Sequence, residues 1–298
     1  MDGFLNILKP PGISSGSVVG YARHRLPRGT AVGHGGTLDP EAAGVLPLCV
    51  GRATRLFDYI IDKEKEYIAE VRLGVETDTQ DATGAIVARA EHFSVTEQDF
   101  LQVLPRFVGE IDQTPPAYSA IKRGGRRMYD LARRGEAVEL SARRVKVHAV
   151  EALSRLAEDR FLLRVRCGKG VYIRTLCHDI GRALGCGAHM SFLLRSRAGV
   201  FDCAGGLTLE EIDALAQAGE LQSRLYPLDA PLAHLGAVYA PAGRERFVRT
   251  GNPLRPGDFA GQAAPGEIVR VYLEKRFAGV GEGTPDGGVR FRAMLLEV

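Results

Sequence analysis

Gly33-His34-Gly35-Gly36-Thr37-Leu38-Asp39-Pro40 is the stretch around which this sequence is organised. It places one carboxylate, Asp39, between a glycine-rich turn and a proline. Glycine permits close backbone approach and positive φ, while Pro40 fixes φ and removes a hydrogen-bond donor beside the acid. The stretch therefore predicts a rigid loop with Asp39 exposed at its tip. The same residues also fit a simple turn, or a helix that begins at Pro40 with Asp39 as its N-cap.

The composition indicates a globular protein with neither a membrane span nor a metal centre. The chain has 298 residues, of which 45% are hydrophobic, enough for one large domain and a small one. No run approaches the ~18 apolar residues of a membrane span, and no signal peptide is recognisable, so we expect a cytoplasmic protein. The cysteines form no C-x-x-C pair and are expected to be buried free thiols: Cys49, Cys167, Cys177, Cys186 and Cys203.

The basic residues are concentrated in one segment. Between Lys122 and Lys146 there are nine basic and three acidic residues, a net charge of +6, so the rest of the chain carries −3 of the total of +3. Such an excess suggests a polyanionic partner, although a solvated helix face has a similar pattern. The preceding residues, 113–122, are rich in proline and lead into the basic segment through two glycines. They predict a mobile loop able to close on a phosphate backbone.

Alternation and capping signals predict an α+β order of elements. Strands are expected near 4–8, 65–73, 85–90, 145–156 and 161–167, the last two as a hairpin. Helices are expected from Ser14 or Ser15 to about Leu26, over 52–62, from Thr96 with Asp99 in a capping box, over 176–184 and over 208–218. Past about Leu235 glycine and proline become dense, and short β-like pieces at 246–249, 267–273, 277–280 and 289–296 predict a small β-rich domain.

Two polar clusters are candidates for chemistry. In Gly168-Lys169-Gly170-Val171-Tyr172-Ile173-Arg174-Thr175, Tyr172 and Arg174 should project from one face of an extended segment. That pair suits a splayed nucleobase or a carboxylate partner, but a cross-strand aromatic with a surface arginine is equally compatible. In the second cluster, Asp78 and Asp81 are close together, yet their threonine neighbours fit an Asx turn at least as well as a metal site.

These stretches together resemble the TruB family of tRNA pseudouridine synthases, which modify the uridine of the T loop. The matching segments follow the family order from about residue 4 to 230. The resemblance implies an α+β catalytic domain over 1–234, with a pseudouridine-synthase-like mixed, largely antiparallel sheet, flanking helices and a cleft crossing the sheet. It also implies a basic RNA-gripping insertion at about 114–146. Residues 235–298 resemble the small RNA-binding PUA domain. The matching segments are 33–40, 44–47, 65–67, 77–79, 113–120, 170–174, 187–189 and 193–195.

Roles for individual residues follow from the resemblance. Asp39 would be the catalytic carboxylate, with Arg174 paired to it. Tyr67 would stack on the target uracil, and Tyr172 would line the pocket. An adjacent cation lowers the pKa of an aspartate, so Asp39 is expected to be ionised and to act as nucleophile or base. The remaining expected contacts with the substrate are Leu193 as an apolar wall, His34 in the space left by the extruded nucleotide, and Lys122, Arg126 and Arg127 on the RNA.

The implied reaction is the isomerisation of the T-loop uridine at position 55 of tRNA. The base must leave its stack, and one carboxylate then acts at the sugar, either by attack at C1′ or by abstraction of the C2′ proton. No cofactor and no metal are implied, and the protein is expected to be a monomer. A non-catalytic tRNA-binding or RNA-folding protein is the main alternative. An enzyme acting on free nucleosides is disfavoured by the basic segment and the extra β-rich domain.

Overall fold

A nine-stranded mixed sheet forms the main body of the protein. The computed structural model describes residues 1–61, 63–116, 122–123, 126–127 and 141–296. The strands run in the order β1, β3, β12, β4, β11, β10 and β7, with β2 added to β3 and β13 to β12. The β3–β12 pair is parallel and the other neighbours are antiparallel, which confirms the predicted fold class. The strands are β1 Gly3–Lys9, β2 Val32–His34, β3 Ala43–Val50, β4 Lys65–Leu73, β7 Gly109–Gln113, β10 Arg143–Ala157, β11 Arg160–Cys167, β12 Ala188–Ala198 and β13 Phe201–Asp202.

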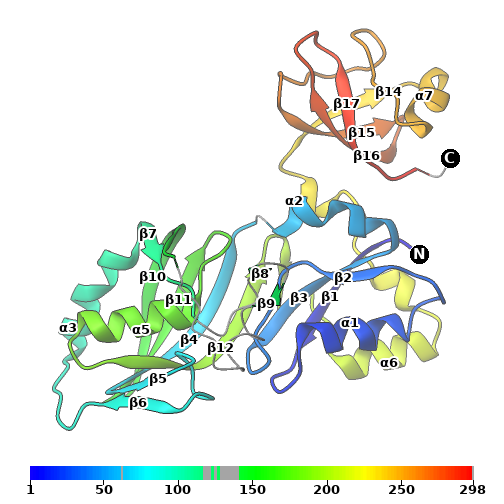
Figure 1. Cartoon of the computed structure of the whole chain (residues 1–298). Coiled ribbons are helices and arrows are strands. Elements are labelled where there is room, and N and C mark those ends of the chain that lie inside the picture. Colours follow the sequence, from blue (N-terminus) through cyan, green and yellow to red (C-terminus); the bar gives the residue numbers. More distant parts are fainter. Residues whose placement is uncertain (62, 117–121, 124–125, 128–140, 297–298) are drawn as a thin grey trace.

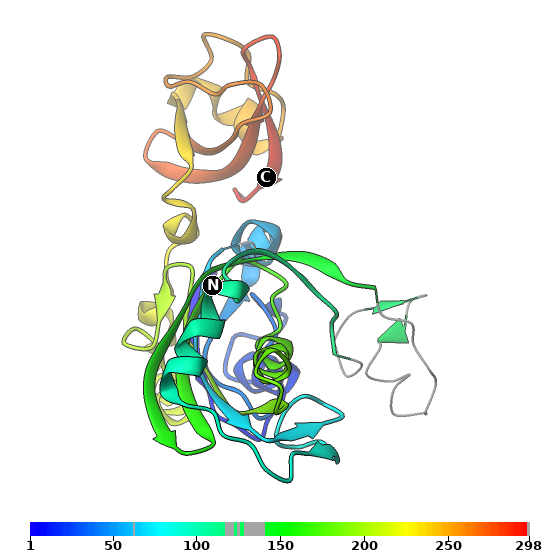
Figure 2. The same cartoon turned by 90° about the vertical axis from the view of Figure 1, so that its left-hand side faces the viewer.

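Helices flank the sheet in two groups (Figure 1). Helix α5 contacts β12 and β4, whereas α1 contacts β2 and α6 contacts β1. In the side view the sheet curves around α5, which is seen end-on (Figure 2). Within the described residues, no helix combines the length and apolar character needed to cross a membrane. The helices are α1 Ser15–Arg23, η1 Gly51–Leu56, α2 Phe57–Ile61, α3 Glu97–Val103, η2 Leu104–Phe107, α5 Ile173–Ala183, α6 Leu209–Gln217, η3 Leu221–Arg224 and η4 Ala230–Leu232.

Local sequence signals account for several of these elements. Along β4 the side chains alternate as predicted, with Tyr67 and Ala69 buried and Glu70 half-buried on the other face. Helix α1 begins after Ser14, whose side chain accepts a hydrogen bond from the backbone N–H of Ser17. Helix α3 has the predicted capping box between Thr96 and Asp99. The β10–β11 hairpin and helix α6, with its N-cap Thr208, are also confirmed.

The sequence analysis missed two central strands, β3 and β12. Strand β12 joins the two halves of the sheet, because it pairs with β4 on one side and β3 on the other. Its pairing with β4 shifts register between Met190 and Phe192 and again between Arg195 and Arg197. These irregularities interrupt the alternation of period two, and a fully buried Arg195 interrupts it further. The strand was therefore invisible to a pattern of alternating hydrophobic residues.

Residues after η4 form a second sheet with its own apolar core. Its strand order is β14-β15-β16-β17, with β14 and β15 parallel. Residues 246–249, predicted as β-like, instead belong to helix α7, in which Glu245 and Arg249 form an i,i+4 ion pair with a 2.8 Å Nε–Oε1 distance. That prediction was wrong because the i,i+4 partner was not considered. The elements are β14 Gly236–Ala240, η5 Ala242–Arg244, α7 Glu245–Arg249, β15 Ile268–Leu273, β16 Arg276–Gly283 and β17 Val289–Met294; two further strand pairs are β5 Val75–Thr77 with β6 Ile86–Arg89, and β8 Lys122–Arg123 with β9 Arg126–Arg127.

The second sheet lies next to α2 (Figure 1), and η1 contacts it as well. A shared apolar cluster joins Leu56 and Ile60 to Val280 and Leu295. The guanidinium of Arg52 donates to the backbone carbonyl of Leu295 at 2.5 Å and forms an ion pair with Asp2 at 2.6 Å. Buried apolar area and charge-assisted hydrogen bonds therefore both join the two sheets.

The buried ring of Phe161 provides a test of the main core. It is 1% exposed on β11 and stacks on Phe100 of α3, with ring centroids 3.8 Å apart. We expect Phe161→Ala to lower the free energy of unfolding by about 3–5 kcal/mol, the usual cost of removing a buried phenylalanine ring. Phe192→Ala, in a ring 45% exposed on β12, is the control and should change it by less than about 1 kcal/mol. Denaturant unfolding checks both values, and equal losses would contradict this view of the core.

Candidate active site

Asp39 lies in the loop that connects β2 to β3. The backbone N–H of Ala42 donates to the carbonyl of Asp39 at 3.1 Å, which closes a turn. The chain then enters β3, so the turn prediction is confirmed and the alternative of a helix beginning at Pro40 is wrong. Gly36 has φ +126°, a conformation that favours glycine. A Cβ atom at Gly35 would come within 2.7 Å of the Ile60 side chain, so glycine is favoured at position 36 by conformation and at position 35 by space.

Two residues near the N-terminus hold the backbone on either side of Asp39. The buried hydroxyl of Ser15 accepts a hydrogen bond from the N–H of Leu38 and donates to its carbonyl, both at 2.9 Å. The ammonium group of Lys9, 1% exposed, donates to the carbonyl of Pro40 at 2.7 Å and also to those of Pro10 and Ile13. Burial lowers the pKa of Lys9 to about 8, which still leaves it charged at neutral pH.

Arg195 binds the backbone of the loop before Asp39 and of the strand after it. Its guanidinium is 1% exposed and donates to the carbonyls of Gly36 at 3.0 Å, Thr37 at 3.3 Å and Val45 at 2.7 Å. Buried cations of this kind are stable only when their donors are satisfied. Lys9 and Arg195 were not among the predicted site residues. Both occur in sequence as single basic residues next to apolar ones, a pattern that gives no indication of burial.

The structure brings Arg174 against Asp39. The Nε of Arg174 lies 3.0 Å from Oδ2 of Asp39, and its Nη2 donates to Oδ1 at 3.3 Å. The Arg174 side chain is 6% exposed and that of Asp39 is 39% exposed. The guanidinium is therefore fixed by the protein, while the carboxylate it contacts is open to solvent on one side. Such a pair can orient the carboxylate without covering it.

The local structure around Arg174 differs from the prediction. Helix α5 begins at Ile173, so Arg174 is in its first turn and Tyr172 is its N-cap residue. The two side chains do not project from one face of an extended segment, and that expectation was wrong. The predicted helix over 176–184 starts three residues too late, because the residues up to Arg174 were expected to form an extended segment.

Asp81 is a third member of this cluster that the sequence analysis did not assign. Its Oδ2 lies 3.3 Å from Nη1 of Arg174, and that Nη1 also donates to the carbonyl of Thr79 at 3.2 Å. Its Oδ1 accepts hydrogen bonds from the Thr83 N–H at 3.0 Å and from the hydroxyls of Thr79 and Thr83. The Asx-turn interpretation is confirmed, and the second oxygen of the same carboxylate contacts Arg174.

The pKa of Asp39 is raised above its usual value. Burial is the main cause, the nearby charge of Asp81 adds to it, and Arg174 and Lys9 oppose it. The net shift of the pKa is therefore upward, although the neighbouring cation lowers it as expected. Arg174 does act in the expected direction, but its charge is shared with Asp81, and desolvation of the Asp39 carboxyl outweighs it.

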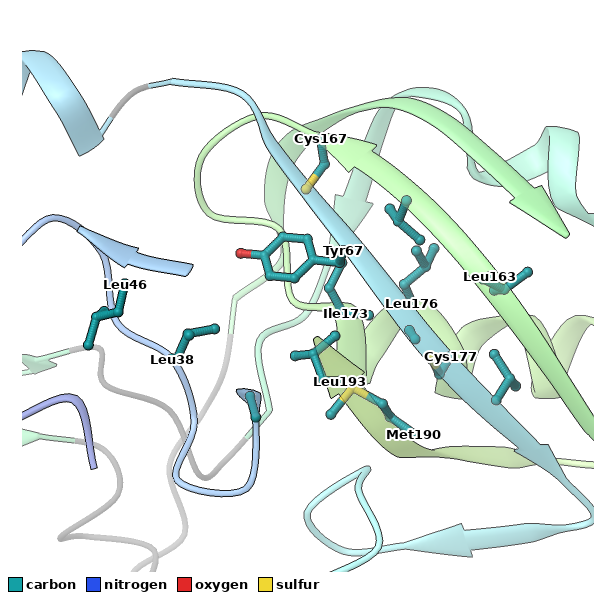
Figure 3. Packing of buried hydrophobic residues seen from close by; sticks show 14 of the residues in the cluster. Leu38, Leu46, Tyr67, Leu163, Cys167, Ile173, Leu176, Cys177, Met190 and Leu193 are labelled. Atoms are coloured by element: carbon teal, nitrogen blue, oxygen red, sulfur yellow. The ribbon is translucent and has the colours of Figure 1, made fainter. Parts of the chain in front are cut away.

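Tyr67 and Leu193 lie together beneath the loop (Figure 3). Both belong to the main apolar cluster with Leu38 and Ile173, and they are 7% and 6% exposed. In Figure 3 the Tyr67 ring points from β4 toward Leu38 and Leu46. Burial raises the pKa of Tyr67, and the charge of Asp39 contributes to this rise. The predicted aromatic and apolar wall residues thus lie in the same apolar cluster as Leu38, the residue before Asp39.

The other predicted contacts lie in different places. His34 is half-buried at the end of β2, and Tyr172 is half-buried at the start of α5. The backbones of Lys122 and Arg127 pair across β8 and β9, but their side chains and that of Arg126 lie outside what the structure describes, as does most of the 114–146 insertion. Among the described residues, no group of three or more His, Cys, Asp or Glu could hold a metal ion. The five cysteines are free thiols, and four of them are buried as predicted, whereas Cys203 is half-buried.

Comparison with known families shows which family this chain belongs to. Residues 24–173 match the family model described as TruB family pseudouridylate synthase (N terminal domain), and residues 174–233 match the tRNA pseudouridylate synthase B C-terminal domain. The chain belongs to the TruB family. It is therefore a pseudouridine synthase, an isomerase, and the alternative of a non-catalytic RNA-binding protein is set aside.

Relatives of this TruB-family chain match it over almost its whole length. The tRNA pseudouridine synthase B of Alkaliphilus oremlandii is 41% identical over 94% of this chain and 93% of the relative. That of Dechloromonas aromatica is 44% identical over 100% and 96%. Among solved structures, an H/ACA RNP bound to a substrate RNA containing 2′-deoxyuridine has a TM-score of 0.76 at 28% identity, and a Cbf5-Nop10-Gar1 complex has 0.77 at 29%; each match covers 99% of this chain and 85% of the other.

The charges around Asp39 predict opposite effects of two substitutions. Arg174→Met should raise the pKa of Asp39, because a cation that opposes the rise is removed. Asp81→Asn should lower it, because a neighbouring negative charge is removed and Arg174 is left to Asp39 alone. Carboxyl ¹³C shifts followed against pH measure the pKa, with Asp39→Asn identifying the resonance. Shifts in the same direction for both variants would contradict this account.

Proposed function

We propose that this enzyme converts the uridine at position 55, in the T loop of tRNA, to pseudouridine, with Asp39 as the catalytic carboxylate. The contact of Asp39 with Arg174 carries the proposal, since it fixes a solvent-accessible carboxylate in a loop whose Leu38 belongs to the same apolar cluster as Tyr67 and Leu193. Curated relatives matching nearly the whole chain are tRNA pseudouridine synthases, and this supports tRNA as the substrate.

The reaction breaks the N1–C1′ bond, turns the uracil and joins its C5 to C1′, with no net gain or loss of atoms. Asp39 acts at the sugar, by attack at C1′ or by removal of the C2′ proton, and both routes begin with an ionised carboxylate. Arg174 favours that ionised form and aims it. No step requires a redox or group-transfer partner, and we propose a reaction without cofactor or metal.

The uridine must leave its stack, at a cost of a few kcal/mol. We propose that Tyr67 and Leu193 receive the uracil, and that Tyr172 lines the same pocket. Because only 7% of the Tyr67 surface is accessible, its ring serves as the floor on which the base rests. His34, half-buried at the end of β2, takes the space that the extruded nucleotide vacates.

RNA binding is assigned to two further parts of the chain. The basic insertion at about 114–146, with Lys122, Arg126 and Arg127, contacts the phosphate backbone of the T stem-loop. Residues 235–298 act as a PUA-like RNA-binding domain beside the catalytic domain of residues 1–234. We propose that the enzyme acts as a monomer.

Asp39→Asn tests the catalytic assignment. The amide cannot act as nucleophile or base, so pseudouridine formation should fall at least about 10³-fold, the scale seen when a group acting in the transition state is removed. Affinity for tRNA should be retained. Asp58→Asn, at an exposed position on α2, is the matched control and should keep the wild-type rate. Mapping of pseudouridine in treated tRNA measures conversion, and wild-type conversion by Asp39→Asn would exclude the assignment.

Charge reversal tests the basic insertion. Arg126→Glu with Arg127→Glu should weaken tRNA binding and reduce the salt slope by about 2, roughly 1 for each lost phosphate contact. Arg160→Glu with Arg164→Glu is the control, because these two arginines already lie 3.7 and 3.3 Å from the carboxylates of Glu70 and Glu151. Binding titrations over a range of salt give the slope. An unchanged slope for the first pair would remove the insertion from the interface.

A further inference from the structure

Gln113, the last residue of β7, makes an unusual pair of buried contacts. Its side chain is almost fully enclosed, with the residue 1% exposed. Its Oε1 accepts a hydrogen bond from the backbone N–H of Tyr172 at 3.0 Å, and its Nε2 donates to the Tyr172 carbonyl at 3.3 Å. The side-chain amide thus binds both backbone polar groups of a single residue, 59 positions away in sequence.

The residue that it holds is the start of α5. Tyr172 is the N-cap residue, and its carbonyl also accepts the first hydrogen bond of the helix, from the Leu176 N–H at 3.0 Å. Arg174 follows two residues later, and its guanidinium contacts Asp39 and Asp81. Thr175 is fixed in the same turn by a 2.8 Å hydrogen bond from its hydroxyl to the side chain of Gln80. The position of the Tyr172 backbone therefore determines the point from which the Arg174 side chain projects.

Gln113 is also the residue directly before the insertion at about 114–146. Its backbone pairs with Arg143 at the start of β10. Residues 114–142 between these two positions include most of the basic segment that runs from Lys122 to Lys146. One buried side chain thus joins the end of β7, where the insertion begins, to the first turn of α5.

We infer that Gln113 is a positioning residue for pseudouridine formation, which keeps the first turn of α5 placed so that Arg174 holds Asp39. The inference rests on the proposed role of Asp39. The chemistry of the amide supports it, since a donor and an acceptor at the end of one side chain are needed to satisfy both groups of Tyr172. Methionine offers neither, and an ionised glutamate offers acceptors alone.

Two substitutions distinguish positioning from simple packing. Gln113→Met keeps the length of the side chain and loses both hydrogen bonds. With enzyme in excess over tRNA, we expect its single-turnover rate to fall about tenfold or more, because a misplacement of 1 Å at a reacting group can cost on the order of 100-fold. The tRNA Kd should stay within about twofold, since the residue does not reach the surface.

Gln113→Glu gives a pH signature that a packing defect lacks. A protonated carboxyl group supplies one donor and one acceptor, as the amide does, whereas the ionised form leaves the Tyr172 carbonyl facing a negative charge. Buried glutamates can reach pKa values of about 8. The rate relative to wild type should therefore rise as pH falls from about 8.5 to about 6. Gln98→Glu, at an exposed position on α3, is the control and should give a constant ratio.

A measurement without substrate separates this inference from the proposed function. Release of Arg174 should raise the pKa of Asp39 in Gln113→Met, because Arg174 lowers it in the wild type. A wild-type single-turnover rate for Gln113→Met, or a pH-independent ratio for Gln113→Glu, would overturn the inference while leaving the role of Asp39 intact. If Gln113→Met fails to fold by circular dichroism, the pH dependence of Gln113→Glu decides the question. Loss of activity in Asp39→Asn tests the proposed function on its own.

Discussion

The arrangement of this site depends on one buried guanidinium shared by two carboxylates. Arg174 lies between Asp39 and Asp81, and each partner is fixed by other elements of the fold. A buried cation is costly unless its donors are satisfied, and here two acids and the Thr79 carbonyl satisfy them. The sharing also limits how strongly Arg174 can stabilise the charge on Asp39. Burial of the carboxyl group, together with the charge of Asp81, therefore raises the pKa of Asp39 although a cation lies at 3.0 Å.

The loop that carries Asp39 is held almost entirely through its backbone. Lys9, Ser15 and Arg195 are buried, and each donates to carbonyl groups of the loop or its flanks. Because these three residues bind backbone atoms, they do not occupy the Asp39 carboxylate, which contacts Arg174. This suits a group that must act on a substrate. Groups held in place by the fold in this way need little reorganisation at the moment of reaction.

The prediction from sequence succeeded where the signal was local. The alternation along β4, the caps of α1, α3 and α6 and the hairpin of β10 and β11 all appear as expected, because each depends on residues a few positions apart. It failed at β12, where bulges and the buried Arg195 break the alternation, and at the start of α5, where an extended segment was expected up to Arg174. The Asp39 turn was predictable, whereas its supports were not. Asp81, for example, was explained by its own turn, and nothing adjacent in sequence pointed to Arg174.

The sequence by itself determined the chemical groups available to this protein, namely a carboxylate in a glycine-rich turn, aromatic and apolar wall residues and a strongly basic segment. Family motifs also allowed Asp39 and Arg174 to be named as partners. Only the tertiary structure decided that Arg174 is divided between two acids, that Lys9 and Arg195 are buried beneath the loop, and that burial outweighs the neighbouring cation at Asp39. The physical reason is that desolvation and shared ion pairs depend on what surrounds a group in space, and those neighbours are 31 to 159 residues away along the chain.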